Sequence, residues 1–213
     1  MKILAVADKV VELIEGPAIR KYFGDVDLVL SCGDLPYDYL EYIVIMLSVP
    51  LFFVRGNHDR EFEHTAEGVV PAYPGGCVDL HRRVLNYRGL LLAGLEGSQR
   101  YKPGPYQYTE REMRWQIWGM WPRLWLNRRR RGRYLDILVT HSAPFGIHDQ
   151  PDLCHRGFRS LTYFIERFRP RLLVHGHIHL YGHDQRWRSR YCETDVVNAF
   201  GYRILEIDVP KAR

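Results

Sequence analysis

The sequence predicts an α/β fold in which two mixed sheets are flanked by helices, and three patterns support this prediction. Apolar strand-like runs alternate with helix-like segments between residues 2 and 54. Short apolar runs separated by turn residues follow between residues 77 and 95, and the alternation returns between residues 135 and 174. Alternation is typical of parallel strands joined by helices, whereas closely spaced runs indicate antiparallel pairing. The 213 residues fit one domain, spanning 1–213.

The first part of the chain predicts a β-α-β-α-β unit. Three runs are almost continuously apolar, as expected for strands that are covered on both faces, namely Lys2 to Ala7, Leu28 to Ser31 and Leu51 to Val54. Helices are expected at Pro17 to Phe23 and at Tyr37 to Leu47. Such a unit has parallel strands joined by right-handed crossovers.

The remaining segments are expected to complete the two sheets. Antiparallel strands of a second, meander-like sheet are predicted at Cys77 to Leu80, Arg83 to Tyr87 and Leu90 to Leu95. A strand, a helix and a further strand are predicted at Leu135 to Thr140, Ser160 to Phe168 and Arg171 to Val174. The C-terminal runs Val196 to Phe200 and Tyr202 to Ile207 predict a hairpin.

An insertion rich in tryptophan and arginine, at about 101–133, interrupts this pattern. Thr109 and Glu112 have the spacing of a capping box and therefore predict the start of a helix. We expect this helix to pack an aromatic face on the core, and a helix at a membrane interface or over a ligand is the alternative. The cluster Arg128–Arg133 is expected to be solvated, or else to contact nucleic acid or an anionic membrane surface.

Composition is that of a globular protein, with 46% hydrophobic residues, 26% charged residues and a formal net charge of +5. The apolar run at the start of the chain is shorter than that of a signal peptide, and no later run predicts a transmembrane segment. Four cysteines lack a CxxC pair and are expected to be reduced. These features predict a cytoplasmic location.

Metal-ligand side chains follow the ends of five predicted strands. They are Asp8, Asp34, Asn57, His141 and the pair His177 and His179. Because the carboxyl ends of strands in an open sheet face one crevice, we expect these side chains to converge. Oxygen and imidazole ligands suit divalent metals that activate water for phosphoryl transfer, and a carboxylate can bridge two such ions.

These motifs resemble those of the calcineurin-like metallophosphoesterase superfamily. The family pattern runs Asp-x-His, Gly-Asp, Gly-Asn-His-Asp or Glu, a lone His, and Gly-His-x-His. The last four blocks are intact at residues 33–34, 56–59, 141 and 176–179, and the resemblance covers nearly the whole chain. It implies a two-sheet αββα sandwich. The first block departs from the pattern, since Val10 stands in Asp8-Lys9-Val10 where the family has histidine.

The resemblance also implies a role for each motif. Two divalent ions (Mn, Fe, Zn or Ni) would be bridged by Asp34, and the ion at Asp8 would be the weaker one because its site has lost one imidazole, at Val10. Asn57, His141 and His177 would complete one site, with Asp8 and His179 serving the other. His58 would stabilise the transition state or protonate the leaving oxygen, with Asp59 orienting it. A metal-bridging hydroxide would attack phosphorus in line.

Two further residues are expected to contact the substrate. Arg55 directly precedes the Gly-Asn-His-Asp motif, and His148 lies in the loop that follows His141. Loops after strand ends carry most site residues.

The predicted function is a divalent-metal-dependent phosphoesterase that acts on a phosphate ester, with a weak preference for phosphodiesters because the arginine-bearing segment offers an extra contact. Val10 leaves open a non-catalytic scaffold of the same fold, and the arginine cluster leaves open a nuclease. Retention of His58 with Asp59 favours the enzyme, since a binding module needs no acid for a leaving group.

Overall fold

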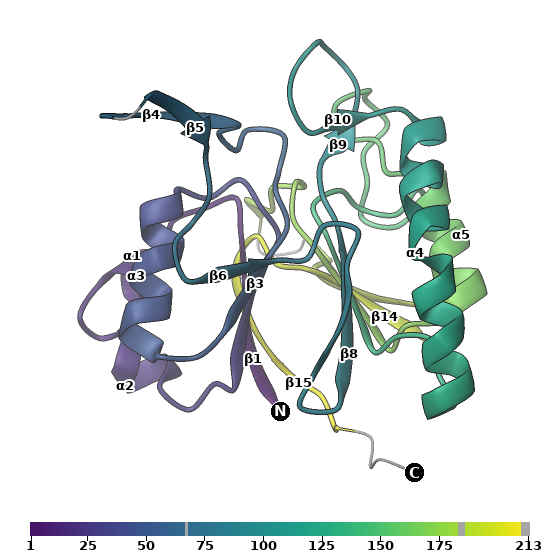
Figure 1. Cartoon of the computed structure of the whole chain (residues 1–213), viewed down its shortest axis with the longest axis horizontal. Coiled ribbons are helices and arrows are strands. Elements are labelled where there is room, and N and C mark those ends of the chain that lie inside the picture. Colours follow the sequence, from purple (N-terminus) through teal and green to yellow (C-terminus); the bar gives the residue numbers. More distant parts are fainter. Residues whose placement is uncertain (67, 183–185, 210–213) are drawn as a thin grey trace.

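The computed structural model describes residues 1–66, 68–182 and 186–209 and shows two sheets packed face to face between helices (Figure 1). Within these ranges the first sheet has five strands in the order β15-β1-β2-β3-β6. The second has six, in the order β13-β14-β12-β11-β8-β7. The predicted α/β fold with mixed sheets flanked by helices is therefore confirmed.

The first sheet is mainly parallel. Its parallel strands are β1 (Lys2–Ala7), β2 (Leu28–Ser31), β3 (Leu51–Phe53) and β6 (Cys77–Asp79), and β15 (Gly201–Glu206) pairs antiparallel with β1. Its outer face carries α1 (Glu12–Glu15), α2 (Ile19–Phe23) and α3 (Tyr37–Leu47). The strand and helix bounds predicted for Lys2–Ala7, Leu28–Ser31 and Tyr37–Leu47 are confirmed to the residue.

The second sheet has a parallel centre and two antiparallel edges. The central strands are β8 (Leu90–Leu95), β11 (Ile137–Thr140), β12 (Leu172–His175) and β14 (Thr194–Asn198). The edges are β7 (Val84–Tyr87) and β13 (Arg188–Tyr191), and the outer helices are α4 (Glu110–Arg131) and α5 (Arg159–Phe168). Two small pairs, β4 (Phe62–Thr65) with β5 (Gly68–Pro71) and β9 (Ser98–Gln99) with β10 (Gln107–Tyr108), lie near one end of the sandwich (Figure 1).

Strands buried on both faces explain the continuous apolar runs. Ile3 and Ala5 of β1 point into the core between the two sheets, whereas Leu4 and Val6 pack under the helices of the first sheet. Because successive side chains of a strand point to opposite faces, both sets must be apolar.

Two sheet assignments were predicted wrongly. β6 joins the first sheet in parallel with β3 rather than the second sheet. The predicted C-terminal hairpin is absent, since β14 lies in the second sheet and β15 in the first. The antiparallel hairpin at this end is β13 with β14. The apolar pattern of a strand shows which of its faces are buried. It cannot show to which sheet the strand belongs, because strands of both sheets are buried in the same way.

Helix α4 begins at the predicted capping box. The Thr109 hydroxyl accepts the Glu112 N–H, and the Glu112 carboxylate accepts the Thr109 N–H. The face that packs on the second sheet is mainly aliphatic, contributed by Met113, Ile117, Met120 and Leu124. The prediction of an aromatic face on the core is wrong for Trp115, Trp118 and Trp125, which are exposed.

None of the helices in the described ranges has the length and apolar character needed to cross a bilayer.

Candidate metal centre

Three predicted ligands meet where strands of both sheets end. Asp34 follows β2, His141 follows β11, and His177 lies two residues after β12. One ligand atom from each residue lies within 4.8 Å of the corresponding atoms of the other two. The structure therefore brings a carboxylate and two imidazoles from both sheets to one point.

The ring of His141 is held in one orientation. This side chain is fully buried, and its Nδ1 lies 2.7 Å from the carbonyl oxygen of Cys32, so Nδ1 carries the proton. Its Nε2 faces Asn57 Oδ1 at 3.1 Å and Asp34 Oδ2 at 3.4 Å. A backbone carbonyl that fixes the tautomer and aims the free nitrogen is the usual support of a metal-bound histidine. Nε2 is therefore the nitrogen available to an ion.

The Asp34 carboxylate is held by the loop that carries the Gly-Asn-His-Asp motif. Its Oδ1 accepts the backbone N–H of His58 at 2.8 Å. Burial alone would raise the pKa of Asp34, but the nearby His141 and the His58 N–H outweigh it and lower the pKa to about 2. The carboxylate is thus ionised throughout the neutral range, as a ligand for a cation requires.

Asp59 makes contacts that differ from the expected one. Its Oδ2 accepts the backbone N–H groups of Gly56 at 2.7 Å and Asp34 at 3.2 Å. Within the described residues no hydrogen bond joins it to the imidazole of His58. In place of orienting His58, Asp59 ties the motif loop to the end of β2. Burial, reinforced by the charge of Asp34, raises the pKa of Asp59 to about 6.

His58 itself lies exposed at the edge of the cluster. Its backbone N–H is fixed on Asp34, while its side chain faces solvent. An imidazole in this position is accessible to a bound molecule.

A second group of predicted ligands lies next to the first. The buried Asp8 carboxylate accepts the backbone N–H of His177. The Nε2 atom of His179 lies 4.0 Å from Asp8 Oδ1, and its Nδ1 bonds the Tyr181 hydroxyl. Val10, where the family has a ligand histidine, packs against the apolar core under the helices of the first sheet. Among the residues that the structure describes, this second group therefore offers fewer ligand side chains than the first.

Three of these residues have a left-handed backbone conformation. Asp8, Asp34 and His177 have φ values of 63°, 57° and 65°. L-residues other than glycine seldom adopt this left-handed region, and such strain persists only where the surrounding structure enforces it. The sharp turn after each strand points these side chains back into one site.

Two motif glycines allow the close approach of these segments. A Cβ atom on Gly56 would lie 2.0 Å from Asp34 Oδ1, and one on Gly176 would lie 2.6 Å from Asp8 Oδ2. Only glycine fits at these two positions while the carboxylates keep their places.

The Arg55 guanidinium makes ion pairs within the protein. Its guanidinium lies 2.6 Å from Asp79 and 3.6 Å from Glu96, and its side chain is 13% exposed. It also lies over the rings of Phe53 and Tyr73. Arg55 thus links Asp79 of the first sheet to Glu96, which follows β8 of the second, and a contact with substrate stays a prediction.

His148 is likewise occupied by protein contacts. Its Nδ1 lies 2.9 Å from Nε2 of His175, and its Nε2 lies 2.8 Å from the Ser189 hydroxyl. With both ring nitrogens bonded, the imidazole has no free polar atom for a substrate. The sequence could not predict these two hydrogen bonds, because His175 and Ser189 lie in β12 and β13, which are distant from His148 along the chain.

Sequence reasoning missed three residues at the rim of the site. The hydroxyl of Tyr101 lies 3.4 Å from the Asn57 amide nitrogen. The carbonyl oxygen of Cys154 lies 2.8 Å from His177 Nε2, and the ring of His155 lies 5.4 Å from that of His177. These residues lie in loops without a motif, so no pattern identified them.

The donor set fits divalent ions of the transition series. One carboxylate, one amide oxygen and two imidazoles surround the point between Asp34 and His141, and no thiol takes part. His177 keeps Nδ1 free because its Nε2 donates to a carbonyl. Burial raises the pKa of Asp8 and lowers that of His179, whereas the charge of Asp34 acts to raise both, so this carboxylate lies near the second group as well.

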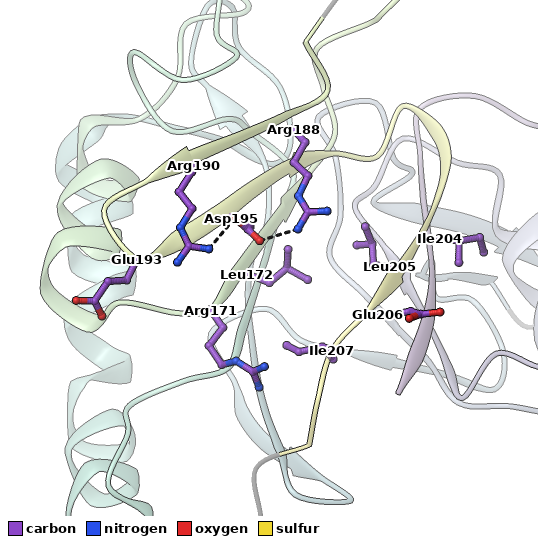
Figure 2. A pocket seen from close by; sticks show the side chains of 10 residues that line it. All are labelled: Arg171, Leu172, Arg188, Arg190, Glu193, Asp195, Ile204, Leu205, Glu206 and Ile207. Atoms are coloured by element: carbon purple, nitrogen blue, oxygen red, sulfur yellow. Dashed lines mark hydrogen bonds and ion pairs between the residues drawn. The ribbon is translucent and has the colours of Figure 1, made fainter.

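A cavity elsewhere is not part of this site (Figure 2). It has a volume of about 330 Å³ and is lined by residues of β12 to β15, including Arg188, Arg190 and Asp195. Both arginines pair with Asp195, so their charge is partly neutralised within the protein. None of the predicted site residues lines it.

Comparison with known proteins agrees with the fold and the motifs. The sequence model described as calcineurin-like phosphoesterase matches residues 3–181. The structure of TT1561 from Thermus thermophilus is similar, with a TM-score of 0.61, 17% identity, and coverage of 94% of this chain and 89% of that one. Zinc-complexed Vps29 from Entamoeba histolytica gives 0.48 and 12%, with coverage of 98% and 87%. No match was found among curated protein sequences.

Proposed function

Because the chain belongs to the calcineurin-like phosphoesterase family, we propose that it hydrolyses phosphate esters with the help of divalent ions held by Asp34, His141 and His177. The observation that carries this proposal is the convergence of these ligand atoms within 4.8 Å, with His141 aimed by the Cys32 carbonyl. Asn57 supplies an amide oxygen beside them. We propose manganese as the first metal to test.

Divalent ions in such a site supply positive charge and an activated water for attack on phosphorus. The protein's own part is to hold the ligands rigidly and to present an acid. His58 is exposed beside Asp34 and is the group that would give a proton to the leaving oxygen. Asp59 fixes the loop that carries His58 by bonding to Gly56 and Asp34.

The second ion site is proposed to be weaker. Asp8 and His179 are its own ligands, and Asp34 is shared. Val10 contributes only apolar packing where the family has an imidazole. An ion there has fewer protein ligands, so its dissociation constant should exceed that of the first site.

A preference for phosphodiesters is supported by the loop between β9 and β10 rather than by the arginine cluster. Tyr101 from that loop reaches the Asn57 side chain and offers a surface for a second substituent. Arg128–Arg131 end α4, which runs away from β10 over about 33 Å for its 22 residues (Figure 1). This distance argues against the cluster contacting a substrate at the site, as the nuclease alternative requires.

The test is hydrolysis of bis(4-nitrophenyl) phosphate and of 4-nitrophenyl phosphate by metal-depleted protein reloaded with manganese. We expect turnover of both, faster for the diester. His58→Ala should lower kcat by about 10²-fold or more while keeping the metal, since general acid catalysis contributes about that much. Asp34→Ala should lose metal and activity together. His64→Ala removes an exposed imidazole from β4 and is the control.

The second candidate function is a non-catalytic scaffold, favoured by Val10. In that case the protein would bind manganese yet leave both esters intact, with wild type and His58→Ala indistinguishable. Metal content and turnover, measured on the same samples, therefore separate the two functions.

A cytoplasmic location is also proposed, because Cys32, Cys77, Cys154 and Cys192 are all free thiols.

A further inference from the structure

The solvent side of α4 exposes an apolar stripe. Trp115, Trp118 and Trp125 are exposed by 57%, 47% and 41%, and Leu126 by 44%. With the exposed Pro122 their spacings are 3, 4, 3 and 1 residues, which places all five on one side of a helix. We call these five residues the α4 outer face. The opposite side of α4 is already buried on the second sheet, so the α4 outer face is a second apolar surface of this helix and is turned to solvent.

The α4 outer face is bordered by positive charge. Seven arginines of this helix are exposed, namely Arg111, Arg114, Arg123 and Arg128–Arg131. The acidic side chains of its first turn are already bonded within the protein. Glu112 pairs with Arg100 and caps the helix at Thr109, and Glu110 accepts the N–H groups of Arg159 and Ser160. The surface is therefore complementary to an anionic partner.

A cavity of about 400 Å³ opens beside the α4 outer face, between α4 and α5. Arg114 and Arg159 come to it from the two helices, and its apolar walls are Ile117, Trp118 and Tyr163. Two guanidinium groups beside aromatic and aliphatic walls match a phosphate that is attached to hydrocarbon. This chemistry is that of a phospholipid at the level of its headgroup and glycerol.

We propose that the α4 outer face and this cavity bind the surface of a bilayer containing anionic phospholipids. Tryptophan favours the interface between water and hydrocarbon, and arginine favours anionic headgroups. A second copy of the chain would bring like charges together. Nucleic acid would engage the arginines, but Pro122 in the middle of the stripe and Leu126 at its end have no π-face for stacking on bases.

The experiment is co-sedimentation with vesicles of phosphatidylcholine alone and with 30 mol% (roughly one lipid in three) phosphatidylglycerol, an anionic fraction sufficient for electrostatic attraction. We expect binding only to the anionic vesicles. Trp115→Ala combined with Trp118→Ala, and separately Arg114→Gln combined with Arg159→Gln, should each lower partitioning by about tenfold. Trp187→Ala is the matched control, since Trp187 is exposed elsewhere and packs on Arg203. Circular dichroism checks that each variant is folded.

Equal binding to neutral and anionic vesicles, or unchanged binding by both double variants, would overturn the proposal. Tight binding of an oligonucleotide that the same variants abolish, without vesicle binding, would also overturn it and assign the face to nucleic acid. The assay does not depend on turnover. His58→Ala should bind vesicles like the wild type, so failure of the enzymatic proposal and failure of this one are separable.

Discussion

Both carboxylate oxygens of Asp8 lie 3.0 Å from the backbone nitrogen of His177 and accept its hydrogen. Asp8 follows β1 in the first sheet, and His177 follows β12 in the second. This contact therefore joins the first and last motifs of the chain and closes the sandwich at the candidate metal centre. Burial raises the pKa of Asp8 to about 7, although His141 acts in the opposite direction.

Removing this acceptor should destabilise the protein even without metal. Asp8→Ala leaves the His177 N–H without its partner, but it also removes a carboxylate whose pKa burial raises to about 7, and such a raised pKa means that the ionised group lowers stability at neutral pH. Asp8→Asn removes the same charge and keeps one acceptor oxygen. We therefore expect Asp8→Ala to lose about 1–3 kcal/mol in the free energy of unfolding relative to Asp8→Asn. Urea unfolding in the presence of a chelator measures both. Equal stability of the two variants would show that the contact is energetically unimportant.

Substituting Gly56 should damage the metal centre specifically. In Gly56→Ala the new methyl group would lie 2.0 Å from Asp34 Oδ1 and 2.6 Å from His141 Cε1, so both ligands must move. We expect manganese affinity to fall by at least about tenfold, because ligand geometry sets the affinity. Calorimetric titration with manganese measures this, and tight binding by the variant would contradict the geometry.

The matched control is Gly119→Ala in the middle of α4. There the nearest atom to a new Cβ is Arg82 Nη2 at 3.6 Å, an ordinary contact. Alanine should raise the free energy of unfolding by about 0.5–1 kcal/mol through helix propensity, with manganese affinity unchanged.

Replacing Arg55 should affect stability rather than substrate binding. Arg55→Met leaves Asp79 and Glu96 without their partner in a largely buried setting, and we expect a loss of about 3–5 kcal/mol. KM for the aryl phosphodiester should change little in the fraction that remains folded. A normal melting temperature together with a raised KM would restore the phosphate contact that the sequence suggested.

His81 should make stability depend on pH below neutrality. Burial lowers its pKa to about 4, whereas the ordinary value is 6.5. Between these values the unfolded chain takes up a proton that the folded protein does not, so stability falls as pH drops from 6.5 towards 4. The full effect is on the order of 3 kcal/mol.

His81→Gln removes this ionisation and should flatten the dependence relative to wild type. Denaturant unfolding at pH 7, 6 and 5, chosen to span roughly this window, measures the difference when a chelator is present in both samples. Glu96 Oε1 lies 3.5 Å from His81 Nε2, and burial raises the pKa of this carboxyl, so both proteins are compared in a Glu96→Gln background that removes it. Parallel curves for the two proteins would refute the assignment.

Most elements and the main ligand set were predictable from the sequence. Strands such as Lys2–Ala7 are apolar on both faces, and that pattern has few structural solutions. Asp34, His141 and His177 each follow a strand, and the carboxyl ends of parallel strands share one edge. The strands and the positions of the candidate ligands after them follow from local residue patterns along the chain. Predicting them therefore required no knowledge of contacts between distant residues.

Only the tertiary structure decided which surfaces meet. It assigned β6 and β15 to the first sheet, paired Arg55 with Asp79, and engaged His148 with His175. It also turned the tryptophans of α4 outwards. Each of these outcomes depends on a partner remote in sequence, and the energy of a contact exists only once both groups are brought together. Residue type and periodicity therefore determine what a side chain can do, while packing determines what it touches.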